Sequence, residues 1–143
     1  MGNNGIGNFE VATQFYAQCK NGTASTSVAG EVVCFDMTTA VDGYTVIQPT
    51  TALLALRAGC WKLSTTEAGK FGDVVIYGYV TNLSVLGHAS MAVGTQVVAT
   101  NGQDYGSYAA AADYSGQTFA FTCEVYTTTT AAAAKKAFIR AMG

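Results

Sequence analysis

The segment from Asp73 to Val85 constrains the fold of this chain more than any other part of its sequence. Apolar or small residues occupy both sets of alternate positions, with Val74, Ile76, Gly78 and Val80 in one set and Val75, Tyr77 and Tyr79 in the other. Successive side chains of a strand point to opposite faces, so a strand here is apolar on both faces. Such a strand is buried on both sides, in a sandwich, in a small barrel or between subunits.

The rest of the chain also favours strands over helices. Threonine, valine and tyrosine are abundant and there are 16 glycines, and branched and aromatic side chains suit a pleated surface. Asp42-Gly43 predicts a turn that joins an apolar run at Val32–Phe35 to Tyr44–Pro49 as a hairpin. Further segments of the sheet are expected at Leu53–Trp61, Met91–Ala99 and Thr118–Tyr126, the last with Phe119, Phe121 and Cys123 on one face, and after the turn Thr127–Thr130 a closing strand follows. The sequence therefore predicts an all-β domain: a small β-barrel, or a β-tulip or sandwich-like fold.

The chain length predicts one domain over residues 1–143. A chain of 143 residues and 14.8 kDa is long enough for one substantial core and short for two. Residues 1–8 are rich in glycine and asparagine and predict a flexible N-terminal arm. Residues 9–143 form the β-rich body, which carries one long surface loop at 104–116.

Charge is scarce, and this bears on the classes of partner. Charged residues make up 11% of the chain and the net charge is −2, against about 25% charged residues in typical soluble domains. No basic patch indicates nucleic-acid binding. The stretch Val74–Gln103 has no Asp, Glu, Lys or Arg, but polar residues interrupt it every few positions, so we expect no transmembrane helix. The N-terminus has no signal-peptide pattern, and export is not expected.

The inventory of reactive groups predicts no catalytic, cofactor or metal site. The four cysteines, Cys19, Cys34, Cys60 and Cys123, are widely spaced and lack metal-site spacing. They are expected to be reduced and mostly buried, with disulfide pairing as the alternative. His88 is the only imidazole, and no nucleophile elbow accompanies it, so a turn histidine is favoured over a base. No two carboxylates share a suggestive local pattern, and only the fold decides whether a pair meets in space.

Two groups of aromatic residues are candidates for a protein interface, where tyrosine is enriched. The first group, near the N-terminus, is Phe9, Phe15 and Tyr16, for which burial in the core is the favoured interpretation. The second group lies in the long loop and consists of Tyr105, Tyr108 and Tyr114, for which an interface and self-packing of the loop are equally favoured.

Five short signatures, taken in order, resemble the head decoration or cement proteins of tailed bacteriophages. They are Ala29–Val33, Gly69–Val80, Val93–Val98, Phe119–Glu124 and Ala134–Arg140, and the likeness spans Val28 to Met142. The resemblance implies a barrel or tulip-like body without catalytic residues or cofactor. It also implies self-association, often as trimers, and binding to the major capsid protein on the outside of the virion, after synthesis in the host cytoplasm.

Three alternatives remain at the level of sequence. A tail-tube or other virion subunit has a compatible size and β content. A carbohydrate-binding module would stack sugar rings on Tyr105, Tyr108 and Tyr114. A small hydrolase would centre on His88 and is the least favoured of the three.

Overall fold

The computed structural model describes residues 14–63, 65–109 and 118–141. The arm predicted at 1–8 and most of the loop beyond Ala109 lie outside these ranges. The described part is all-β, as predicted, with one short 3₁₀ helix. The elements are β1 (Phe15–Asn21), β2 (Val32–Phe35), β3 (Thr45–Ile47), η2 (Thr51–Leu56), β4 (Arg57–Trp61), β5 (Phe71–Leu86), β6 (Gln96–Ala99), β7 (Gly106–Tyr108), β8 (Thr118–Thr122) and β9 (Ala132–Arg140).

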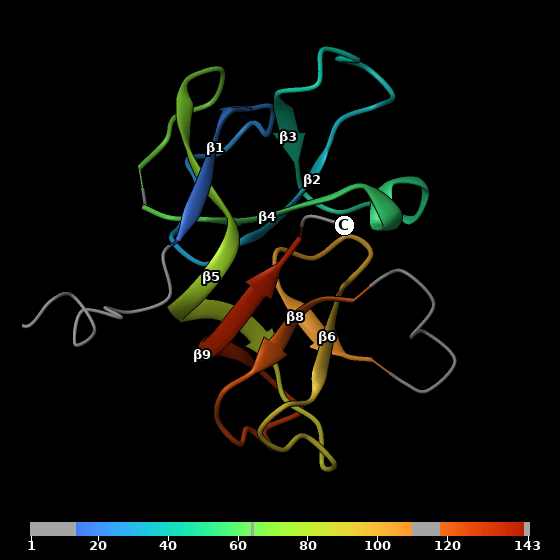
Figure 1. Cartoon of the computed structure of the whole chain (residues 1–143). Helices are drawn as coiled ribbons and strands as arrows, with labels where there is room; N and C mark the ends of the chain where they lie inside the picture. Colours follow the sequence, from blue (N-terminus) through green and yellow to red (C-terminus); the bar gives the residue numbers. More distant parts are fainter. Residues whose placement is uncertain (1–13, 64, 110–117, 142–143) are drawn as a thin grey trace, which may run out of the picture.

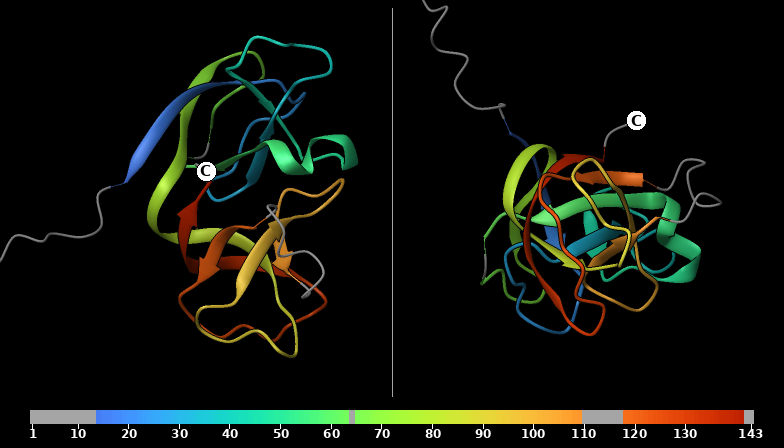
Figure 2. Two further views of the ribbon diagram at one scale, coloured as in Figure 1. Left: turned by 45° about the vertical axis from the view of Figure 1, so that its right-hand side comes forward. Right: turned by 90° about the horizontal axis from the view of Figure 1, so that it is seen from below.

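These strands form two small barrels that share the long strand β5 (Figure 1). The order β1-β3-β2-β4-β5 closes on itself because β1 also pairs with β5. The order β5-β7-β6-β8-β9 closes in the same way because β9 also pairs with β5. Tyr77 marks the crossing point, since it pairs with Phe15 of β1 on one side and with Arg140 of β9 on the other. Figure 2 shows β5 curving from one barrel into the next.

The two barrels have the same strand topology. In the first, β1 and β3 are parallel and every other pair is antiparallel. In the second, β5 and β7 are parallel and the rest are antiparallel. The register of β2 with β4 shifts between Val33 and Cys34, and that of β6 with β8 shifts between Val97 and Val98. The chain therefore folds as an internal repeat in which β5 is the last strand of one unit and the first of the next.

Backbone hydrogen bonds show the repeat residue by residue. The equivalent positions are Gly30 and Gly94, Glu31 and Thr95, and Trp61 and Thr122. In the first barrel, the Gly30 N–H donates to the Trp61 carbonyl at 2.8 Å, and the Trp61 N–H donates to the Glu31 carbonyl at 3.0 Å. In the second barrel, the Gly94 N–H donates to the Thr122 carbonyl at 2.7 Å, and the Thr122 N–H donates to the Thr95 carbonyl at 2.9 Å. Two of the signatures noted in the sequence, Ala29–Val33 and Val93–Val98, are thus the same turn and strand used twice.

Two hydrophobic clusters make up the core. A smaller cluster fills the first barrel and includes Trp61 and Val74. A larger cluster fills the second barrel and extends into the space between the two, where it includes Cys60 and Val75. The neighbours Val74 and Val75 of β5 thus point into different clusters and both are buried. This confirms the prediction that the strand is buried on both faces.

The observed bounds of several strands differ from the predicted ones. The antiparallel pair of β2 and β3 and the closing strand β9 form as predicted. Residues 36–44 join β2 to β3 as an irregular loop with bends rather than the tight turn predicted at Asp42-Gly43. The segment Leu53–Trp61 is extended only from Arg57, because η2 occupies its first part. Likewise Met91–Ala99 is extended only from Gln96. The predicted loop contains a strand, β7. Phe119 has no partner in β6, and this bulge buries it together with Ala120, so the one-face pattern expected for β8 is wrong.

Candidate functional site

Phe15 and Tyr16 at the start of β1 lie on the surface. Their side chains are 54% and 41% exposed, so the prediction that they belong to the core is wrong. The register between β1 and β5 shifts between these two residues. A bulge of this kind breaks the alternation of inward and outward side chains, which explains why neighbouring positions are both exposed.

The exposed aromatic residues continue along the same side of the first barrel. Lys20 of β1 is opposite Phe71 of β5, and the Phe71 ring, 56% exposed, lies 5.6 Å from the ring of Tyr44. At the other end of β1, the Lys62 ammonium sits 3.9 Å from the centre of the Tyr16 ring. We refer to Phe15, Tyr16, Tyr44 and Phe71 as the aromatic surface. Tyr44 and Phe71 join it only through strand pairing, so local sequence patterns did not single them out.

A chain of ring contacts links this surface to the second barrel. The Phe15 and Tyr77 ring centroids are 5.9 Å apart, and Tyr77 meets Phe138 of β9 edge to face at 5.0 Å. Such tilted and edge-to-face pairs are favourable arrangements for aromatic rings. Strands β1, β5 and β9 therefore hold Phe15 in place although most of its side chain faces solvent.

The other predicted aromatic residues do not join this surface. Phe9 and Tyr114 lie outside the described residues. Tyr105 and Tyr108 are half-buried, and Tyr108 packs against the larger core cluster. Tyr105 lies in the bend just before β7, whereas Tyr108 belongs to β7 itself.

His88 lies in the turn after β5 and is exposed. Its ring stacks on Tyr108, with centroids 4.2 Å apart and planes inclined by 11°. Its Nδ1 accepts a hydrogen bond of 3.1 Å from the backbone N–H of Ser90. These contacts are those of the turn histidine favoured by the sequence.

All four cysteines are free thiols, and three of them are buried. Burial raises the pKa of Cys19 to about 11 and that of Cys34 and Cys60 to about 12. Burial also raises the pKa of Cys123, which is only half-buried. Since the thiolate is the reactive form, these side chains act as small apolar groups of the fold.

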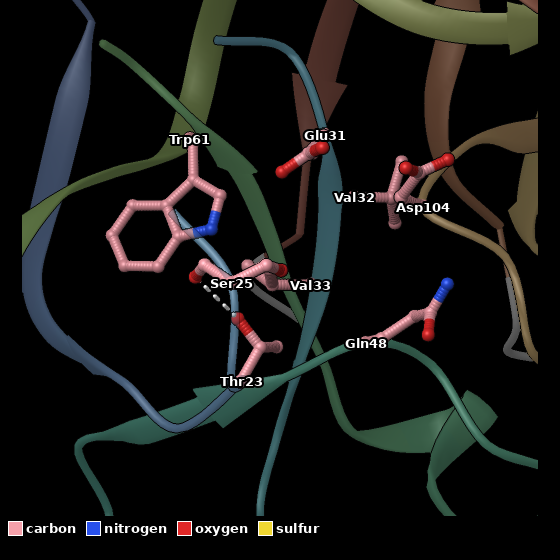
Figure 3. Close-up of a pocket in the computed structure, with 8 residues that line it drawn as sticks. All are labelled: Thr23, Ser25, Glu31, Val32, Val33, Gln48, Trp61 and Asp104. Atoms are coloured by element: carbon pink, nitrogen blue, oxygen red, sulfur yellow. Dashed lines mark hydrogen bonds between the residues drawn. The ribbon is translucent and has the colours of Figure 1, made fainter. Parts of the chain in front are cut away.

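A pocket of about 100 Å³ opens at one end of the first barrel (Figure 3). Trp61 forms its inner wall, and Glu31 stands beside it because the two residues pair through the backbone across β2 and β4. The connection between β1 and β2 adds Thr23 and Ser25. The remaining lining residues are Val32, Val33, Gln48 and Asp104. Mouths of β-barrels are common places for ligand sites.

Asp104 comes from the second barrel, and three hydrogen bonds hold its turn against the first. The Asp104 carbonyl accepts from the N–H of Val32 at 2.7 Å. The N–H of Gly102 donates to the Pro49 carbonyl at 2.8 Å, and the Gln48 side-chain amide donates to the Gly102 carbonyl at 3.2 Å. The pocket is therefore built from both repeats and depends on their packing.

Glu31 and Asp104 form the carboxyl pair that local sequence patterns did not reveal. One Glu31 oxygen, Oε2, accepts from the N–H of Val28 at 2.8 Å. Burial raises the pKa of Glu31, the Val28 hydrogen bond lowers it, and the charge of Asp104 and a hydrogen bond between the two carboxyl groups raise it again, with a net increase. The pair thus favours holding a proton on Glu31.

The raised pKa predicts a pH effect on stability. The pKa of Glu31 is higher in the folded than in the unfolded state. The stabilisation that this shift gives is therefore complete below the unfolded pKa and is lost as the pH rises through the folded pKa. The amide oxygen of Glu31→Gln can still accept from Val28. We therefore expect the free energy of unfolding of this variant, relative to that of the wild type, to increase as the pH rises from 4 to 7. Urea unfolding at both pH values measures this. Glu67→Gln, at an exposed position, is the control, and an equal pH response in both variants contradicts the prediction.

Within residues 14–63, 65–109 and 118–141, no three His, Cys, Asp or Glu side chains gather as metal ligands do. In the same part of the chain no helix has the length and apolar character needed to cross a membrane. No protein-family model and no curated protein matches the chain.

Proposed function

We propose that this chain is a non-enzymatic structural protein of a virion. It decorates the outside of a tailed-phage head and stabilises it by binding the major capsid protein and copies of itself, as trimers. The resemblance of its ordered signatures to decoration proteins supports this assignment. It is synthesised in the host cytoplasm and ends on the capsid exterior.

The observation that carries the proposal is the aromatic surface. Phe15, Tyr16 and Phe71 are large apolar side chains, each more than two-fifths exposed. Ring and cation contacts hold them in defined positions. Ordered, exposed aromatic residues are typical of the centres of protein interfaces. This face of the first barrel is where we place the contact with neighbours in the particle.

The closed barrels limit the way in which such contacts form. Every described strand has a hydrogen-bonded neighbour on each side. A protein with paired strands does not offer a free edge for strand addition. For the described residues, we therefore expect neighbours to be bound through side chains rather than by extension of a sheet.

Loss of the aromatic surface is expected to abolish self-association and binding to heads. We predict that the double variant Tyr16→Ser, Phe71→Ser sediments as a monomer at concentrations where the wild type is a trimer. Heads assembled with it should resist heat and osmotic shock no better than heads without the protein. The matched control is Val93→Ser, Val125→Ser, which removes two exposed apolar side chains elsewhere. An aromatic-surface variant that is folded by circular dichroism yet still trimeric and protective would contradict the proposal.

Electron microscopy of the particles separates the head assignment from the tail alternative. A decoration protein gives added density on the head surface, whereas a tail-tube subunit gives stacked rings. The carbohydrate module based on loop tyrosines has less support, because the Tyr108 ring stacks on His88 and packs against the core.

A further inference from the structure

The pocket of the first barrel has an indole N–H in its wall. The Trp61 side chain is only 2% exposed, and its N–H has no acceptor among the described residues and is open to the pocket. Figure 3 shows the indole nitrogen on the edge of the ring that faces the other pocket residues. An occupant of the pocket that accepts a hydrogen bond can therefore bind this N–H without displacing a protein partner.

The second barrel shows that the fold does not impose this arrangement. At the position equivalent to Trp61, the Thr122 hydroxyl donates to the Ala92 carbonyl at 2.6 Å and accepts from the N–H of Thr95 at 3.1 Å. At the position equivalent to Glu31, the Thr95 hydroxyl accepts from the N–H of Ala92 at 2.9 Å. In the second barrel, the side-chain hydroxyls at these two positions are hydrogen-bonded to the backbone. In the first barrel, the same backbone arrangement holds an indole N–H without a protein acceptor beside two carboxyl groups.

The three polar groups define the chemistry of the occupant. The Trp61 N–H can donate a hydrogen bond, whereas the carboxyl oxygens of Glu31 and Asp104 that face the pocket can accept one. A cation satisfies the carboxylates and leaves the indole without a partner, and an anion does the reverse. A hydroxyl group both donates and accepts, so two neighbouring hydroxyls satisfy all three groups at once. A space of about 100 Å³, about three waters in volume, admits two hydroxyls with their carbons.

We propose that the mouth of the first barrel binds a vicinal diol of a carbohydrate. The Trp61 indole donates to one hydroxyl, and the carboxyl groups of Glu31 and Asp104 accept from the pair. Val32 and Val33 line the pocket with apolar surface for the C–H groups of the sugar edge. The rest of the sugar ring extends outward from the barrel. This site is separate from the aromatic surface and does not depend on the proposed virion function.

The single tryptophan of the chain lies in this pocket and reports binding directly. The experiment titrates the full-length protein with methyl glycosides of glucose, galactose and mannose while the tryptophan emission is recorded. We expect a saturable change with at least one sugar and a dissociation constant on the order of 1 mM. Glu31→Gln and Asp104→Asn should each weaken the affinity about tenfold or more, and Glu67→Gln should not change it.

Several outcomes would overturn the proposal. One is a titration without saturation for every sugar. Another is a saturable response to calcium chloride or methylammonium chloride but to none of the sugars, which would identify a cation site. A third is sugar affinity that is unchanged in both Glu31→Gln and Asp104→Asn. Because Asp104 is exposed, Asp104→Asn gives a folded variant even where Glu31→Gln disturbs the β1–β2 connection.

Discussion

Gly30→Ala is expected to lower the free energy of unfolding more than any other substitution considered for the turns of this protein. Gly30 has φ of +89°, and a Cβ atom built there lies 1.7 Å from the Asn82 carbonyl oxygen of β5. The N–H of Ser84 also donates to the Gly30 carbonyl at 2.9 Å, so the turn and β5 cannot separate without losing that bond. The loss should exceed about 4 kcal/mol, beyond the usual range for a single substitution. Urea unfolding followed by circular dichroism measures it.

The internal repeat supplies a matched control for this prediction. Gly94 occupies the equivalent turn with φ of +84°, and a Cβ atom there meets nothing within 4 Å. Gly94→Ala therefore has the same backbone strain without the clash and should cost about 1–3 kcal/mol. The difference between the two variants isolates the close approach of the Gly30 turn to β5. Equal losses in the two variants would show that backbone strain alone sets the cost.

Features that depend on a short stretch of chain were predictable from the sequence. The apolar pattern around Val74 and Val75 predicted a strand buried on both faces, and Asp42-Gly43 predicted the antiparallel pair of β2 with β3. In each case the signal lies in neighbouring residues and expresses strand periodicity or turn chemistry. The closing strand β9 belongs to the same class, whereas residues 127–129, predicted as a turn, form none.

Features that depend on strand pairing were not predictable. The bulges that expose Tyr16 and bury Phe119 are shifts of register between distant segments, and one such shift reverses the face of every following side chain. The repeat was hidden for the same reason. Its equivalent positions hold residues as different as Trp61 and Thr122, so the likeness lies in backbone hydrogen bonds. The pair Glu31 and Asp104 meets only after the two barrels pack.

The repeat also explains how one small chain carries two separate surfaces. Both barrels use the same turn and the same bulge to close, so the backbone frame does not depend on the side chains at the mouth. The second barrel closes its mouth with the hydroxyls of Thr95 and Thr122. The first barrel has Glu31 and Trp61 there and opens a pocket, while its outer face carries the aromatic surface. Duplication of a stable frame thus leaves one copy available for binding.

Phe119→Ala is expected to destabilise both barrels together. Phe119 is fully buried in the second barrel, and its cluster extends to Cys60 and Val75 of the first. Removal of a buried phenylalanine side chain typically costs about 3–5 kcal/mol. Because one core cluster spans the two barrels, the emission of Trp61 in the first barrel should report the same lowered urea midpoint as circular dichroism of the whole chain.

The control for this last prediction is Phe71→Ala, which removes the same ring from an exposed position and should change stability by about 0.5 kcal/mol. Both halves of β5 contribute side chains to the larger core cluster. If this strand couples the barrels, the Trp61 emission and the circular dichroism of Phe119→Ala should show the same urea midpoint. If the Trp61 transition stays at its wild-type midpoint while circular dichroism shows an earlier loss, the second barrel unfolds alone. The chain would then be two domains joined through β5, contrary to the single domain expected from its length.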